Sequence, residues 1–425
     1  MTKIPKAEWI VAVLLVAAIK LVSVTTLYYG WKFVPRADYG SDLWITRQDT
    51  SFLENLANFD GAWFVRLGAI GYKKLAAGDY DLSAETERLR VMDELGAEQG
   101  MWPREESYKG FDRGYGYRHW PFFPWLINAA DKIGLDPVAA AVVMSNIFTL
   151  AYGLVLFALA RKDFSLSISL FAVAVSQLHP GGYALTAAYN ESLFLVFAAG
   201  SMLSAREEKW WVAGLLAMGA SMTRIFGVVL AVPLAYEWMA SRSENAGSSE
   251  RLSDVLSIGN IKRSFKGAYE RPVFWWALLI PAGTLVVFLF FHYVAGDAMI
   301  WTKVHEENVH GHINWPWLMM VETYNKGWHV WMKELPLHAL LLVVLVASFG
   351  RVRHSYWVWM LAFFLFHTSN GNHSYLRYQV QCLPMFIALA AIVETRPWLK
   401  YTLLCLFASL SGIFSAMYIN GYWVA

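Results

Sequence analysis

Long apolar runs constrain the fold of this chain more than any other feature. The first, from Trp9 to Tyr29, has enough residues to cross a bilayer, and similar runs recur to the carboxyl end. The 425 residues are 57% hydrophobic and only 16% charged, which is more apolar surface than a soluble fold buries. Because lipid offers no hydrogen bonds to the backbone, these runs predict helices. We therefore expect an all-α polytopic membrane protein.

The spans are predicted from the length of each run and from its charges. Lys20 interrupts the first run, which favours a retained span over a cleaved signal peptide. Arg224 stands in the middle of another run, where a charge costs at least ~2.5 kcal/mol, so we expect two half-spans that meet there. With these the bundle has about eleven spanning or half-spanning helices. The remaining predicted spans are 138–160, 166–177, 192–204, 273–295, 336–349, 356–366, 380–393 and 401–417.

The basic residues indicate one orientation of a single domain, 1–425. With the amino terminus in the cytoplasm, the basic turns at 161–162, 206–209, 351–353 and 396–400 are all cytoplasmic. So is a linker, 240–271, whose Ser-, Asn- and Gly-rich start predicts a flexible segment without a chemical role. Residues 30–119 become a large, charged first extracytoplasmic loop with interfacial helices. The net charge of +2 gives no indication of a nucleic-acid partner.

Asp60 is the candidate catalytic residue. It follows the first span, in a segment where Leu56, Phe59, Trp63, Leu67 and Ile70 recur at helical spacing, which predicts one amphipathic helix lying on the bilayer surface. The nearest basic residue in that helix is too far around it to form a pair, so we expect an unpaired carboxylate available for chemistry. A helix-capping or surface role is the alternative.

Further charged or polar residues on the same predicted face are candidates for substrate binding. Arg118 and His119 end the charged loop, where an aromatic belt and a phosphate contact are equally good interpretations. Asn190 and Glu191 begin an apolar span after a proline-glycine break. Arg224 needs a partner, either Glu191 or a bound anion, and we favour the anion.

Two residues near the penultimate span complete the candidate set. Arg377 either binds the same anion as Arg224 or extends its side chain to the membrane interface. His373 lies in the turn before Arg377. For metals, Asp79 and Asp81 form a minimal acid pair suited to Mg²⁺ or Mn²⁺, but such pairs are frequent in charged loops. We therefore expect no cofactor and no resident metal.

Several short motifs occur in a fixed order, and together they carry a resemblance: Phe59-Asp60-Gly61-Ala62-Trp63-Phe64, Pro121-Phe122-Phe123-Pro124, Ala188-Tyr189-Asn190-Glu191-Ser192, Thr223-Arg224-Ile225-Phe226-Gly227 and Arg377-Tyr378. In this order the chain resembles the glycosylphosphatidylinositol mannosyltransferase II family, the PIG-V type, within the GT-C membrane glycosyltransferases. The resemblance implies a GT-C-like bundle, a polyprenyl-phosphate-linked mannose donor, an extracytoplasmic active site and an acidic catalytic base at the position of Asp60.

The chain departs from this family in two places. Asn190 stands where the family often has threonine, and the charged insertion from Leu75 to Arg118 is long. The expected acceptor is accordingly a glycolipid or a cell-surface glycan. A membrane transporter or lipid flippase is the main alternative function, and a non-catalytic lipid-binding subunit is a third.

Overall fold

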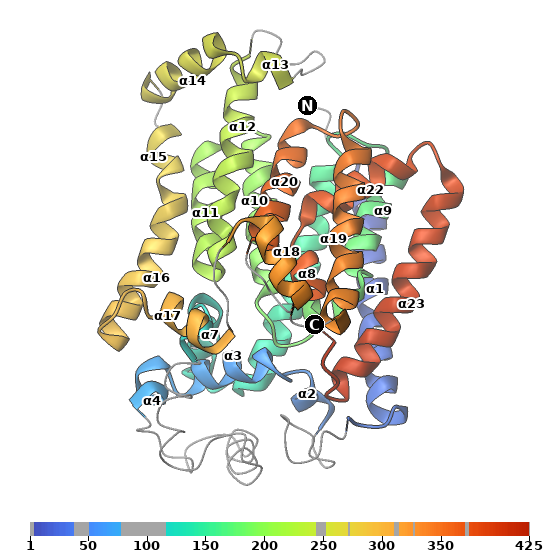
Figure 1. Cartoon of the computed structure of the whole chain (residues 1–425). Coiled ribbons are helices and arrows are strands. Elements are labelled where there is room, and N and C mark those ends of the chain that lie inside the picture. The colour runs from blue at the N-terminus through green and yellow to red at the C-terminus, as the bar shows by residue number, and fades with distance from the viewer. Residues whose placement is uncertain are drawn as a thin grey trace.

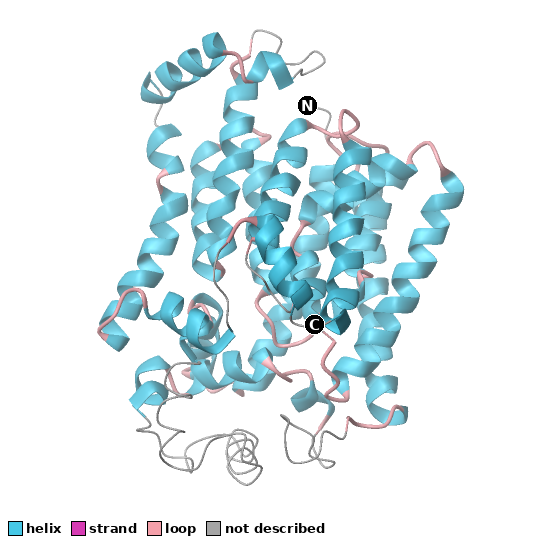
Figure 2. Ribbon diagram, in the orientation of Figure 1, coloured by secondary structure: helices cyan, strands magenta, loops and turns pink. Residues whose placement is uncertain are grey.

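The computed structural model describes residues 4–37, 51–77, 116–243, 252–270, 273–309, 314–325, 328–369 and 374–424. Within these ranges every regular element is a helix and no strand occurs (Figure 2). The expectation of an all-α protein is confirmed. Much of the charged loop 30–119 lies outside the described residues.

The described helices follow one another along the chain (Figure 1). Their bounds are α1 Lys6–Phe33, α2 Phe52–Asn55, α3 Asp60–Ala69, α4 Tyr72–Ala77, η3 Gly116–Arg118, α7 Phe122–Asp131, α8 Pro137–Ala160, α9 Leu166–Gln177, η4 Pro180–Leu185, α10 Glu191–Ala205, α11 Trp210–Thr223, η5 Ile225–Leu230, α12 Ala231–Ser241, α13 Leu252–Val255, α14 Ile258–Glu270, α15 Val273–Ala277, α16 Leu279–Ala295, α17 Ile300–Val309, α18 Pro316–Asn325, α19 Trp328–Ser348, α20 His354–Thr368, α21 Tyr375–Gln379, α22 Leu383–Val393 and α23 Pro397–Ile419.

In the part of the chain that the structure describes, four helices are long and apolar enough to cross a membrane: Lys6–Phe33, Pro137–Ala160, Trp275–Ala295 and Pro397–Ile419. Shorter apolar helices coincide with several of the other predicted runs, such as Leu166–Gln177 with 166–177 and Leu383–Val393 with 380–393. The expected break at Arg224 is present, because α11 ends at Thr223 and Arg224 is extended, with φ −153° and ψ 144°. The chain is thus an integral membrane protein, while the number of spans stays a prediction.

The bundle is held by close helix contacts. α10 packs between α8 and α11, and α1 packs against α8, α9 and α23. Lys20 of α1 donates from Nζ to the Leu185 carbonyl at 3.0 Å and to Thr186 Oγ1 at 2.9 Å. These bonds satisfy a charge in an apolar helix and join α1 to the η4 turn.

One predicted element is wrong. The segment from Leu56 to Ile70 is not a continuous surface helix, because Phe59 adopts φ 53° and separates α2 from α3. α3 is buried around its circumference from Gly61 to Gly68, against α7 and α8. The apolar spacing is real, but α3 has protein on every side, so Arg66 is buried as well.

The predicted linker 240–271 contains helices beyond its Ser-, Asn- and Gly-rich start. It includes the end of α12 and two helices, α13 and α14, while residues 244–251 lie outside the described part. α14 lies across the end of the bundle opposite to α3 and α7 (Figure 1). This segment is therefore structured over much of its length.

Candidate active site

Asp60 is the first residue of α3, directly after the strained Phe59. A non-glycine residue at positive φ costs about 1–3 kcal/mol and persists only where its surroundings hold it. Here Tyr189 and Tyr418 donate their hydroxyls to the Asn58 carbonyl at 3.2 and 3.3 Å, and the Ala188 amide donates to the Leu56 carbonyl at 2.8 Å. The turn before Asp60 is thus fixed by residues from distant parts of the chain.

A chain of alternating charges runs inward from Asp60. Arg377 Nη1 lies 2.6 Å from Asp60 Oδ2, and Arg377 Nε lies 3.1 Å from Glu191 Oε1. Arg224 Nη1 lies 2.8 Å from the same Glu191 oxygen and 2.7 Å from Asn190 Oδ1. Glu191 is fully buried, so it anchors both arginines in a setting where ion pairs are little screened.

Tyr378 lies beside both arginines. The guanidinium of Arg377 lies 5.0 Å from the centre of the Tyr378 ring, and that of Arg224 lies 5.1 Å from it. A second ring, Tyr189, lies 5.0 Å from Arg377. Aromatic faces stabilise cations at these distances, so two like charges can be held side by side.

Glycine allows the close approaches that place both arginines. A Cβ on Gly181 of η4 would lie 2.5 Å from the Leu376 carbonyl, so only glycine lets η4 contact the helix that carries Arg377. A Cβ on Gly227 would lie 2.4 Å from the backbone of Ala220, where η5 folds back beside the end of α11. These contacts bring Arg377 and Arg224 to one place.

His119 and Arg118 come to the site from the end of the charged loop. His119 Nε2 lies 3.6 Å from Asp60 Oδ1, and the ring stacks on Trp63 with centroids 5.9 Å apart. The His119 carbonyl accepts a bond of 2.6 Å from the Tyr72 hydroxyl, and the Arg118 carbonyl accepts one of 3.2 Å from Trp301. Aromatic residues thus position both His119 and Arg118 at the site. An aromatic belt and a polar role are therefore compatible in this segment.

The pKa values at Asp60 follow from these neighbours. Burial raises the pKa of Asp60, but the Arg377 guanidinium, with His119 and Arg118, outweighs burial and holds that pKa well below its usual range. Burial lowers the pKa of His119 more than the contact with Asp60 raises it. At neutral pH Asp60 is a carboxylate and His119 is a neutral imidazole.

These residues surround a cavity of about 100 Å³ with a mixed polar and apolar lining. Its lining includes Asp60, Arg118, His119, Asn190, Thr223, Arg224, His367, Arg377, Tyr378 and Gln381. Gln381 and His367 are buried, and no hydrogen bond satisfies their side-chain polar atoms among the described residues. A buried polar group without a partner costs about 1–3 kcal/mol, so both are well suited to meet a polar ligand.

Most of the residues expected from sequence meet at this cavity. Glu191 lies behind it, and His373, Asp79 and Asp81 fall outside the described residues. One expectation is wrong, because Asp60 is paired. Arg377 is buried, which excludes the alternative that its side chain extends to the interface. Arg224 pairs with Glu191, and it also lines the cavity, where a bound anion can reach it.

Gln381 and His367 are not among the candidates from the sequence, and Tyr378 occurs there only as part of the Arg377-Tyr378 motif. Gln381 is a single polar residue inside the predicted run 380–393, and His367 directly follows the run 356–366. Neither position by itself shows where the side chain points. Among the described residues, no group of three or more His, Cys, Asp or Glu is arranged to hold a metal ion. The polar character of this cavity comes from arginines, carboxylates and amides.

Comparison with known proteins gives one match. A family model described as dolichyl-phosphate-mannose-protein mannosyltransferase matches residues 118–251, from Arg118 through Arg224 to the start of the linker. Neither a curated protein nor a solved structure matches the chain significantly. The match and the apolar helices together indicate a membrane glycosyltransferase. The finer resemblance to the PIG-V type stays a prediction.

Proposed function

We propose that the protein transfers a hexose, mannose by its resemblance, from a polyprenyl-phosphate donor to a hydroxyl of a glycolipid or cell-surface glycan on the extracytoplasmic face. Asp60 is the proposed base. The observation that carries the proposal is that one carboxylate and three arginines, Arg118, Arg224 and Arg377, line a single cavity. Arginine is the side chain best suited to bind a phosphate, and a carboxylate is suited to accept the proton of a hydroxyl.

The net charge of the site is complementary to that of a phosphodiester. Asp60 and Glu191 contribute two negative charges, the three arginines contribute three positive ones, and His119 is neutral. The site therefore carries one surplus positive charge, and a polyprenyl-phosphate sugar carries one negative charge. A nucleotide sugar, with its diphosphate, carries more negative charge than the site neutralises.

The donor phosphate and Asp60 compete for Arg377. While Arg377 contacts Asp60 at 2.6 Å, the carboxylate is a weak base. A phosphate that draws this guanidinium toward itself raises the pKa of Asp60 at the moment when a base is needed. Donor binding thus makes Asp60 a stronger base. Without the donor, the contact with Arg377 keeps the carboxylate a weak base.

The reaction follows as a single displacement. The acceptor oxygen attacks the anomeric carbon while its proton passes to Asp60. The bond from that carbon to the phosphate oxygen breaks, and the phosphate leaves with the electron pair beside Arg224 and Arg377. Displacement inverts the anomeric centre, so a β-linked donor gives an α-linked product. The amide of Gln381 and the ring of His367 are placed to bind sugar hydroxyls.

The test is transfer of labelled mannose from polyprenyl phosphate by purified protein, with membrane glycolipid extract as acceptor. Asp60→Asn keeps the size of the side chain and removes the base, so we expect transfer to fall by about 10²- to 10⁴-fold. Glu54→Gln is the matched control, because Glu54 is a half-buried acid in the same segment, where it forms part of the cap of α2.

Full activity of Asp60→Asn would contradict the proposed role. A product with the β linkage from a β-linked donor would contradict the single displacement. A transporter or flippase predicts movement of the intact donor across the bilayer in both proteins, and a non-catalytic subunit predicts no turnover with any donor.

A further inference from the structure

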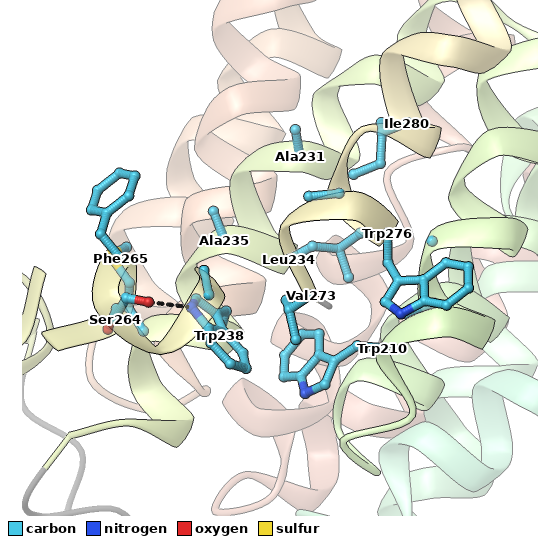
Figure 3. A pocket seen from close by; sticks show the side chains of 15 residues that line it. Trp210, Ala231, Leu234, Ala235, Trp238, Ser264, Phe265, Val273, Trp276 and Ile280 are labelled. Carbon is cyan, nitrogen blue, oxygen red and sulfur yellow. Dashed lines mark hydrogen bonds between the residues drawn. The ribbon is translucent and has the colours of Figure 1, made fainter. Parts of the chain in front are cut away.

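A second cavity lies far from the candidate active site. It has a volume of about 270 Å³ and lies among α11, α12, α14, α15 and α16. The indole rings of Trp210, Trp238 and Trp276 border it, and none of its lining residues is charged (Figure 3). An apolar cavity of about 150 Å³ is enough to stay dry and hold a benzene-sized molecule. This one has room for part of a hydrocarbon chain.

The position of the cavity separates it from the proposed sugar site. Trp210 begins α11 and Arg224 follows its last residue, so at 1.5 Å per residue the two ends are about 21 Å apart along the helix. In Figure 1 α14, which covers the cavity, and α3, which begins with Asp60, lie at opposite ends of the bundle. The cavity therefore opens toward the other leaflet.

α14 presents three different faces. Small or uncharged polar residues, Asn260, Ser264 and Gly267, are buried toward α12, and Trp238 donates its indole N–H to the Ser264 carbonyl at 3.1 Å. Ile258 and Phe265, seven residues apart, are 73% and 63% exposed. A large apolar residue on a helix that crosses the bundle end is typical of an interfacial helix in contact with lipid.

The third face is basic. Lys262, Arg263 and Lys266 recur at three- and four-residue spacing and are exposed, and no acidic residue occurs between 258 and 268. Beside them, the guanidinium of Arg242 lies 4.5 Å from the centre of the Trp238 ring and contacts the position of Gly267. Trp238 lines the cavity, so a positive group lies next to the apolar space.

We propose that this end of the bundle binds an anionic glycerophospholipid. One acyl chain occupies the cavity bordered by the three tryptophans. The headgroup phosphate lies beside Arg242 and the basic face of α14. Both parts of the lipid then have a counterpart of matching chemistry: the acyl chain meets an uncharged apolar lining, and the headgroup meets Arg242, which contacts Trp238 of that lining, and the basic residues of α14.

The experiment uses full-length protein in phosphatidylcholine nanodiscs that contain a small fraction of spin-labelled phosphatidylglycerol. Its readout is the motionally restricted fraction of the label and the competition by unlabelled lipids. We expect unlabelled phosphatidylglycerol to compete and phosphatidylcholine not to compete. Lys262→Gln, Arg263→Gln and Lys266→Gln combined should reduce the preference for phosphatidylglycerol by at least about tenfold.

Matched controls separate a local site from general attraction. Neutralising Lys209, Arg351 and Lys400 removes as much charge from the same end of the bundle without touching α14, and should leave the preference intact. To test binding of the acyl chain, Ala235→Phe places a bulky ring in the cavity and should reduce the motionally restricted fraction of the label. Val232→Phe, on the same helix and 47% exposed but outside the cavity, should not.

Three results would overturn the inference. The first is a preference that survives the α14 substitutions or is lost equally in the control triple. The second is a restricted fraction unchanged by Ala235→Phe. The third is competition by polyprenyl phosphate but not by phosphatidylglycerol, which would assign the cavity to the sugar donor instead.

Discussion

At the scale of single residues, Glu191 holds the site together. It is fully buried and contacts both Arg224 and Arg377, so Glu191→Gln leaves Arg224 without a carboxylate and Arg377 with Asp60 alone. Breaking a buried pair in this way costs about 3–5 kcal/mol, which we expect to appear as a clear fall in melting temperature in detergent. Glu207→Gln is the control, since Glu207 pairs with lysines at the surface and should change stability by about 0–1 kcal/mol. Equal melting temperatures for the two variants would show that Glu191 is not the anchor.

The pairing of Asp60 with Arg377 gives a prediction for pH. Because the pKa of Asp60 lies below its usual range in the free protein, the acid limb of the kcat/KM profile should lie below about pH 3.9. Removing the positive charge raises the pKa of the carboxylate, so Arg377→Gln should move that limb to higher pH. Arg353→Gln, which removes an arginine paired with Glu237 at the other end, should leave the limb in place. An acid limb that does not move in Arg377→Gln would contradict the pairing.

At the scale of elements, the contact of α3 with α7 positions Asp60. A Cβ on Gly68 would lie 2.5 Å from Ile127 Cγ2, so Gly68→Ala must push the two helices apart and displace the residue that begins α3. A misplacement of about 1 Å costs up to about 10²-fold in rate, and we expect at least a tenfold loss of transfer in a folded variant. Gly259→Ala on α14 meets nothing within 4 Å and serves as the control. Unchanged transfer by Gly68→Ala would show that this contact does not set the geometry of the site.

At the scale of the whole molecule, the predicted orientation places Asp60 outside the cell and α14 inside. Cys405 is exposed and is first replaced by alanine, while Cys382 is buried. Ile133→Cys, at a position 77% exposed between α7 and α8, should then react in intact cells with a thiol reagent that cannot cross the membrane. Lys209→Cys, before α11 at the opposite end, should react only after the cells are opened. The reverse pattern would place the active site in the cytoplasm.

Much of the fold was predictable because a backbone that crosses lipid must satisfy its hydrogen bonds internally. Apolar runs long enough to span must be helices, and the break at Arg224 followed from the cost of a charge in hydrocarbon. The prediction of a surface helix is wrong for α3, which is buried from Gly61 to Gly68. Periodicity cannot distinguish a helix on a surface from one packed on every side, and it gives no sign of the positive φ at Phe59.

The sequence by itself determined a helical membrane protein with a few expensive polar residues, among them Asp60, Glu191, Arg224 and Arg377. Burying such residues in an apolar setting costs free energy, so their presence in or beside apolar runs marks them as candidates. Only the tertiary structure decided that Arg377, from the last part of the chain, neutralises Asp60, from the first. It also decided that Gln381 and His367 face the same cavity. Electrostatic pairing depends on distance in space, and α21, η4 and α3 come together only when the bundle is packed.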